Sequence, residues 1–241
     1  MMRISIKSLL FGFIAITSVI GCSTMNTEDK VQKATSHFQL GVSYLNDNNI
    51  QPAFVEFQKA LELNPEDKEV LNAIGVIYLL KLEDYQRAVE HFKRALSVDR
   101  SFSEASNNMG LAYEKMGMFK EAVDAYKAAL TNPLYRNAEK ALNNLGRSYY
   151  RLGRFDDAID AYKESIRRFS NFHLPYYGLA LSYNAKGIRD DAANALKKAV
   201  EYDPLFRGDR KMAVRDMSER KLIVKGDEEK DLEVLLKIMN Y

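Results

Sequence analysis

The stretch GRSYYRLGRFDDAIDAYKES, residues 146–165, decides the fold because it is one copy of a pattern that recurs along the chain. In this copy a small residue, Gly146, precedes Tyr149 by three positions, and Ala158 precedes Tyr162 by four. Spacings of three and four residues place side chains on one face of a helix. The stretch therefore predicts two helices that cross closely, because a small residue on each one lets the backbones approach.

The same positions recur at steps of 34 to 36 residues. The first aromatic series is Tyr44, Tyr78, Tyr113, Tyr149 and Tyr183, and each member is preceded by Gly41, Gly75, Gly110, Gly146 or Ala180. The second series is Ala53, Ala88, Ala122, Ala158 and Ala192, followed four positions later by Phe57, Phe92, Tyr126, Tyr162 and Leu196. This pattern resembles the tetratricopeptide repeat (TPR). It predicts an all-α fold, a right-handed α-solenoid of five to six helix-turn-helix repeats.

The periodicity divides the chain into five repeats and a tail. The repeats are framed as 34–67, 68–102, 103–138, 139–172 and 173–206. Residues 207–241 lose the repeat pattern, but their leucines keep helical spacing near the end. An array needs its last apolar face covered, so we expect 207–241 to be a C-terminal helical cap or a degenerate sixth repeat. A partner surface around Met212 and Met217 is the alternative.

The N-terminus carries a different signal. Arg3 and Lys7 precede an apolar run that is too short to span a bilayer, and the run ends in Gly21-Cys22. A small residue directly before the chain's single cysteine resembles the bacterial lipobox. We therefore expect residues 1–21 to be a lipoprotein signal peptide, Cys22 to be lipidated, and 22–33 to form a short tether. An ordinary signal peptide or a short membrane anchor is the alternative. The residue after Cys22 is Ser23, not aspartate, which by the Gram-negative sorting rule favours the periplasmic face of the outer membrane.

Charge and composition narrow the function classes. The chain has a formal net charge of +2, and removing Arg3 and Lys7 with the signal leaves zero, so no global field attracts nucleic acid. The three histidines fall in three different repeats, and no metal-ligand spacing, phosphate-binding glycine loop or nucleophile elbow is present. We expect no enzyme activity, no cofactor, no metal and no small-molecule substrate. Protein binding remains.

The first helix of each repeat should line the concave side of the solenoid. Positions four residues apart share one face of that helix. This face predicts a peptide-binding groove made of Phe38, Val42, Asn72, Val76, Asn107, Leu111, Asn143, Arg147, Arg151 and Tyr177. Amide side chains can bond a peptide backbone whatever its sequence, and Arg147 and Arg151 would meet an acidic group of the guest. The alternative is that the asparagines are ordinary polar residues on a solvated helix.

One segment breaks the rhythm between repeats 3 and 4. Asn132-Pro133-Leu134-Tyr135 is followed by a helix containing Asn144-Leu145-Gly146. With the lipoprotein start and the repeat array, this segment resembles the tetratricopeptide type IV pilus biogenesis lipoproteins, the secretin pilotins of the PilW, PilF and Tgl type. Residues 136–137, Arg-Asn, stand where that family usually has Thr-Pro.

The resemblance implies an outer-membrane lipoprotein that assists localisation and multimer assembly of the pilus secretin. A generic periplasmic scaffold for cell-wall hydrolases or outer-membrane protein assembly is the alternative. We expect Leu134 and Tyr135 to pack between repeats 3 and 4, with a partner contact by Tyr135 as the other interpretation.

Overall fold

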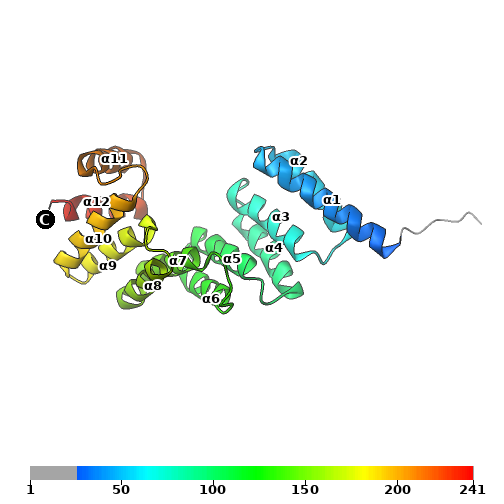
Figure 1. The fold of residues 1–241 in the computed structure, drawn as a ribbon, viewed down its shortest axis with the longest axis horizontal. Coiled ribbons are helices and arrows are strands. Elements are labelled where there is room, and N and C mark those ends of the chain that lie inside the picture. The colour runs from blue at the N-terminus through cyan, green and yellow to red at the C-terminus, as the bar shows by residue number, and fades with distance from the viewer. Residues whose placement is uncertain (1–25, 241) are drawn as a thin grey trace, which may run out of the picture.

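The computed structural model describes residues 26–240, which form twelve α-helices. They are α1 (Thr27–Asn46), α2 (Ile50–Leu63), α3 (Lys68–Leu80), α4 (Tyr85–Val98), α5 (Ser103–Lys115), α6 (Phe119–Ala129), α7 (Ala138–Arg151), α8 (Phe155–Arg168), α9 (His173–Ala185), α10 (Arg189–Tyr202), α11 (Arg210–Ile223) and α12 (Asp227–Ile238). Consecutive helices pair into six hairpins that follow one another along an elongated, curved array (Figure 1). The predicted all-α solenoid is confirmed.

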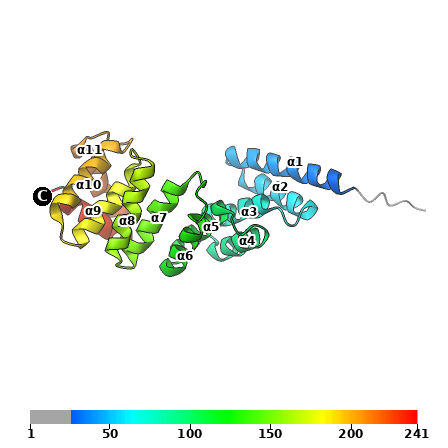
Figure 2. The same cartoon turned by 60° about the horizontal axis from the view of Figure 1, so that its bottom comes forward.

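Within the first five hairpins, packing alternates in a regular way. The two helices of a hairpin pack against each other, and the second helix then packs against the first helix of the next hairpin. Figure 2 shows the hairpins stacked side by side from α1 to α10. The first helices also contact one another directly, as α3 with α5, α5 with α7 and α7 with α9. These first helices form one continuous surface, which is where the sequence predicts the groove.

The small and aromatic positions of the repeat meet as predicted. A Cβ added to Gly75 would lie 2.5 Å from the Phe92 ring, and one added to Gly110 would lie 2.6 Å from the Tyr126 ring. Both rings are fully buried. The glycine therefore provides the space into which the large ring of the second helix packs, and burial of such a ring is worth about 2 to 3 kcal/mol.

The turns inside the hairpins need a left-handed residue. Gly117, Gly153 and Gly187 have φ values of +74°, +72° and +76° at this position. The second hairpin has Glu83 there instead, with φ +53°, in a turn one residue longer. Only glycine adopts this conformation without a steric penalty, so the backbone at Glu83 is strained.

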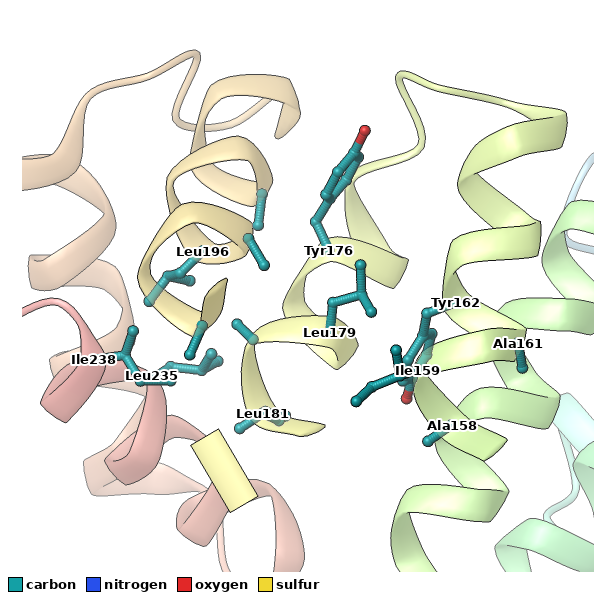
Figure 3. Packing of buried hydrophobic residues seen from close by; sticks show 14 of the residues in the cluster. Ala158, Ile159, Ala161, Tyr162, Tyr176, Leu179, Leu181, Leu196, Leu235 and Ile238 are labelled. Atoms are coloured by element: carbon teal, nitrogen blue, oxygen red, sulfur yellow. The ribbon is translucent and has the colours of Figure 1, made fainter. Parts of the chain in front are cut away.

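The last hairpin departs from the stacking rule. α12, rather than α11, packs closely against both α9 and α10. Leu235 and Ile238 of α12 lie beside Leu196 of α10 (Figure 3). α12 therefore covers the apolar face that repeat 5 would otherwise expose.

The first helix begins before the first repeat frame. Asn26 caps α1, because its side chain accepts a hydrogen bond from the Asp29 N–H at 2.9 Å. Residues 27–33, assigned above to the tether, form the opening turns of α1. Cys22 and the signal segment 1–21 lie outside the described residues. None of the helices within 26–240 combines the length and apolar character that crossing a bilayer requires.

Candidate peptide-binding groove

The predicted groove residues all lie on first helices, but they differ in what they contact. In the N-terminal half, Phe38 and Val42 of α1 are half-buried against the core around Phe57, with the Phe38 and Phe57 ring centroids 5.7 Å apart. Val76 of α3 packs in the same way against the cluster that contains Phe92. These three side chains contribute part of their surface to the core of their own repeats.

The three asparagines do not form a uniform row. Asn72 Oδ1 accepts a hydrogen bond from Asn108 Nδ2 at 3.0 Å, which joins repeats 2 and 3. The Oδ1 atom of Asn107 is buried and has no hydrogen-bond partner among residues 26–240. Asn143 is buried, with only 6% of its surface exposed. An unpaired buried acceptor such as Asn107 Oδ1 costs stability, and because the atom is not accessible from outside it does not offer a contact to a peptide in the groove.

Arg147 forms an ion pair with Glu114 of the same protein rather than pointing free into the groove. Its Nε lies 2.6 Å from Glu114 Oε1 and its second guanidinium nitrogen lies 2.7 Å from Oε2, which is a bidentate pair between α7 and α5. The Tyr126 hydroxyl donates to the same carboxylate at 2.7 Å. Burial, with Glu114 beside the ring, raises the pKa of Tyr126. The Glu114 side chain is only 7% exposed, whereas the Arg147 side chain is 40% exposed. The network therefore joins repeats 3 and 4 through a buried carboxylate and a guanidinium that reaches solvent.

Arg151 is bound by the C-terminal helix. Its two terminal nitrogens donate to the two carboxylate oxygens of Asp231, and its Nε lies 3.7 Å from Asp227 Oδ2. The Arg151 guanidinium also lies over the Tyr150 ring, 5.4 Å from its centroid. The sequence predicted that a guest would supply an acidic group to this arginine. In the structure α12 supplies it.

A cavity of about 770 Å³ remains between the first helices and the C-terminal hairpin. Five of the predicted groove residues line it: Leu111, Asn143, Arg147, Arg151 and Tyr177. Tyr177 donates a hydrogen bond to Asp203 at 3.0 Å, and burial with that carboxylate raises the pKa of Tyr177. Phe38, Val42, Asn72, Val76 and Asn107 do not line it. The open part of the groove therefore lies over repeats 3 to 5.

Sequence reasoning missed the other wall of this cavity. Asp227, Asp231, Leu232 and Leu235 of α12 line it opposite the arginines. The available signal was the run of mostly acidic residues in 227–231 followed by Leu232 and Leu235, because acidic residues complement a groove that contains two arginines. Lys115 lines the cavity too, and it is exposed at the end of α5 without an ion pair in the described part of the chain.

The segment between repeats 3 and 4 corrects one expectation. Tyr135 is buried against Ala129, Ala138 and Ala141, as expected, and burial raises its pKa to about 12. Leu134 does not pack between the repeats, because it is 84% exposed. Its N–H donates to Asn132 Oδ1 at 3.0 Å, and this local turn directs the leucine outward.

Within residues 26–240, no three histidine, cysteine, aspartate or glutamate side chains come together as metal ligands would. His37 Nδ1 lies 2.6 Å from Glu56 Oε2, and Lys59 donates to the other oxygen at 2.7 Å. These contacts lower the pKa of Glu56, with Lys59 contributing most. The arrangement joins α1 to α2 and has the character of a structural ion pair.

Tetratricopeptide-repeat models match residues 34–67, 56–90, 76–140, 107–172 and 176–205. The matched segments cover most of the described hairpins. The chain belongs to the tetratricopeptide-repeat family. Members of such TPR scaffold families are typically non-enzymatic and act by binding other proteins, which is the coarse function that the chain shares.

Two curated TPR relatives are similar to about half of this chain. The type IV pilus assembly protein PilF of Pseudomonas aeruginosa is 25% identical over 130 residues, which is 51% of each protein. The lipoprotein NlpI homologue of Haemophilus influenzae is 27% identical over 136 residues, which is 53% of this chain and 42% of that protein. The chain therefore spans about half the length of the curated relatives it matches.

Solved TPR structures share the fold. PilW, described as a widely conserved type IV pilus biogenesis factor, superposes with a TM-score of 0.69 at 21% identity over 86% of this chain and 90% of PilW. The MamA protein superposes with a TM-score of 0.62 at 26% identity over 71% of this chain and 92% of MamA. The likeness to PilW establishes the solenoid alone.

Proposed function

We propose that this protein is a lipid-anchored TPR scaffold of the outer membrane that helps the type IV pilus secretin to localise and to assemble into its multimer. The observation that carries the proposal is the similarity to PilF over half of the chain. The insert Asn132-Pro133-Leu134-Tyr135 supports it, because it presents one large apolar side chain to solvent on a turn fixed by a buried tyrosine.

The binding surface in this proposal is the groove over repeats 3 to 5. It offers apolar side chains such as Leu111, the unpaired cation Lys115, and the arginines already paired with Glu114 and Asp231. A guest gains most from Lys115, because the other cations would have to exchange one carboxylate for another. An acidic residue of the secretin at this position fits the site.

The test is a deletion strain complemented with single variants and scored for heat-resistant secretin multimers. Lys115→Glu should lower the yield of multimers and the amount of secretin captured from detergent-solubilised membranes. Lys120→Glu is the matched control, because Lys120 is also exposed, lies on α6 and does not line the cavity. Equal effects of the two variants, or none, would refute the groove as the secretin site.

The anchor is tested separately in the same strain. Cys22→Ala should release the protein from the outer-membrane fraction and lower multimer yield, while the purified variant binds secretin as before. Retention of Cys22→Ala in that fraction would refute lipidation at this residue.

A second candidate function rests on the similarity to the NlpI homologue, which is a lipoprotein by its name. In this second candidate function, the chain acts as a periplasmic scaffold for cell-wall hydrolases or for outer-membrane protein assembly. The capture experiment separates the two functions, because recovery of peptidoglycan enzymes in place of secretin would favour the second.

A further inference from the structure

The solvent-facing side of α11 carries a stripe of exposed residues that begins with two cations and ends with an aliphatic side chain. Lys211, Arg215, Ser218 and Leu222 recur at helical spacing and are all exposed, so they form one stripe along the helix. The opposite side carries the buried Ala213 and Met217. Figures 1 and 2 show α11 at the outer edge of the C-terminal end of the array.

The cations of this stripe are not neutralised by the neighbouring acidic helix. Arg220 pairs with Glu228 at 2.8 Å, and Lys225 lies 3.6 Å from Glu229. No carboxylate pairs with Lys211 or Arg215 anywhere in residues 26–240. The acidic residues of α12 instead form ion pairs with Arg151, Arg220 and Lys225, so Lys211 and Arg215 keep their positive charges.

The stripe ends in two large aliphatic side chains that the fold leaves in water. Leu222 and Ile223 are each 80% exposed in the last turn of α11, next to Lys221 and Lys225. Surface helices normally place polar residues at such positions, so adjacent aliphatic side chains with this exposure indicate a partner that is apolar at that point. The partner must also be negatively charged beside it.

We propose that α11 is a membrane-contact helix that rests on an anionic phospholipid surface. Leu222 and Ile223 enter the boundary between headgroups and acyl chains, while Lys211 and Arg215 lie against the phosphates. The long stems of lysine and arginine can follow the apolar surface and keep their charges among the headgroups. This contact is independent of the groove and of the secretin.

Two features favour lipid over other anionic partners. Residues 210–223 contain no aromatic side chain, whereas single-stranded nucleic acid is bound by stacking on aromatic rings between the cations. The two aliphatic side chains project from a helix end, which suits insertion into a fluid layer. An acidic protein partner is the alternative that the experiment must separate.

The chain has no tryptophan, so a single introduced tryptophan reports its own surroundings. Full-length Leu222→Trp is mixed with vesicles of pure phosphatidylcholine and with vesicles of equal parts phosphatidylcholine and phosphatidylglycerol. Its emission should shift to the blue only with the anionic vesicles. Leu134→Trp is the matched control, because Leu134 is equally exposed on a distant segment, and its emission should not shift.

The charges are tested in the Leu222→Trp background. Lys211→Glu with Arg215→Glu should weaken the partition into anionic vesicles by about thirty-fold or more, since each cation near an anionic surface contributes about 1 kcal/mol. Circular dichroism should show the same helix content, because both positions are exposed.

Three results would overturn the proposal: no shift of Leu222→Trp with anionic vesicles, an equal shift of Leu134→Trp, or unchanged partition of the charge variant. The first of these is also the result that an acidic protein partner predicts. Failure of the secretin experiments leaves the vesicle result unaffected, because they use different residues.

Discussion

The ring of Tyr162 fills the space in which a side chain at Gly146 would lie. A Cβ built on Gly146 would be 2.7 Å from Tyr162 Cε1, and Gly178 of the next repeat closes the other side of the same ring. The ring is therefore held between two glycines from consecutive repeats and cannot move away from either. This contact fixes both the crossing within repeat 4 and the stacking of repeat 5 on it.

Gly146→Ala should destabilise the protein although alanine is normally the better helix former. The helix preference favours alanine by about 1 kcal/mol, whereas overpacking costs about 1 to 3 kcal/mol. We therefore expect a net loss of up to about 2 kcal/mol in the free energy of unfolding, measured in urea.

The matched rescue is Tyr162→Leu, because repeat 5 has Ala180 and Leu196 at these two positions. The double variant should lose less than the sum of the single losses, as expected for residues in contact. Strict additivity would contradict the close packing.

Glu83→Gly should raise the melting temperature. The left-handed backbone at Glu83 costs about 1 to 2 kcal/mol of stability, which glycine would relieve. The greater freedom of glycine in the unfolded chain offsets about 0.5 to 1 kcal/mol of this gain. Gly153→Ala is the opposite case, because its φ is +72° and its Cβ would meet nothing within 4 Å. It should lower stability by about 1 kcal/mol. Changes of the same sign in both variants would contradict the backbone explanation.

Tyr135→Ala and Leu134→Ala should separate packing from contact in the inter-repeat segment. Tyr135 is buried against three alanines, so its loss should cost about 3 kcal/mol of unfolding free energy. Leu134 is exposed, and its loss should cost less than about 0.5 kcal/mol. Thermal unfolding by circular dichroism measures both. A large loss in Leu134→Ala would mean that the leucine is covered in solution.

Glu114→Gln should destabilise the junction of repeats 3 and 4. The change leaves Arg147 without its counter-charge and disturbs the bond from Tyr126, for which we expect a loss of about 2 kcal/mol. Glu164→Gln is the control, because Glu164 pairs with the exposed Arg167 and solvent screens that pair, so the loss should be below about 0.5 kcal/mol. Equal losses in urea unfolding would show that the Glu114 network is not buried in solution.

Asp99 should contribute a defined part of the acid sensitivity. Lys68 donates to it at 2.6 Å and Ser101 donates twice, and these bonds lower the pKa of Asp99 to about 2, with Lys68 contributing most. The unfolded chain binds a proton near pH 4, before the folded chain does. The stabilisation is therefore complete above about pH 4 and is lost as the pH falls towards 2. Asp99→Asn should flatten the dependence of urea unfolding on pH across that window, and an unchanged slope would contradict this.

The contacts between the repeat positions could be predicted from the sequence because the two partners lie close together along the chain, within one hairpin. Gly75 of α3 and Phe92 of α4, for example, lie on the two helices of one hairpin, so their spacing along the chain already identifies their contact. The cap could be predicted in outline, because an apolar end must be covered.

The groove could be predicted only in part. Spacing places Arg151 on the inner face of α7, but its partner Asp231 lies 80 residues later, and no periodic pattern links the two. The amide of Asn72 is likewise paired within the protein, with Asn108 of the next repeat, 36 residues later. The apolar side chain of Leu134 predicts packing between the repeats, whereas the structure leaves it exposed on a turn in which its N–H donates to Asn132 Oδ1.

The bond between Arg151 and Asp231 has a consequence for the order in which the array comes apart. Stacked hairpins usually fray from either end, one unit after another. Here α12 is joined to α7 of the fourth hairpin by an ion pair, so the C-terminal hairpin cannot unfold without breaking that ion pair. Hydrogen exchange should therefore proceed inward from α1, with α7 to α12 opening together as a single cooperative block.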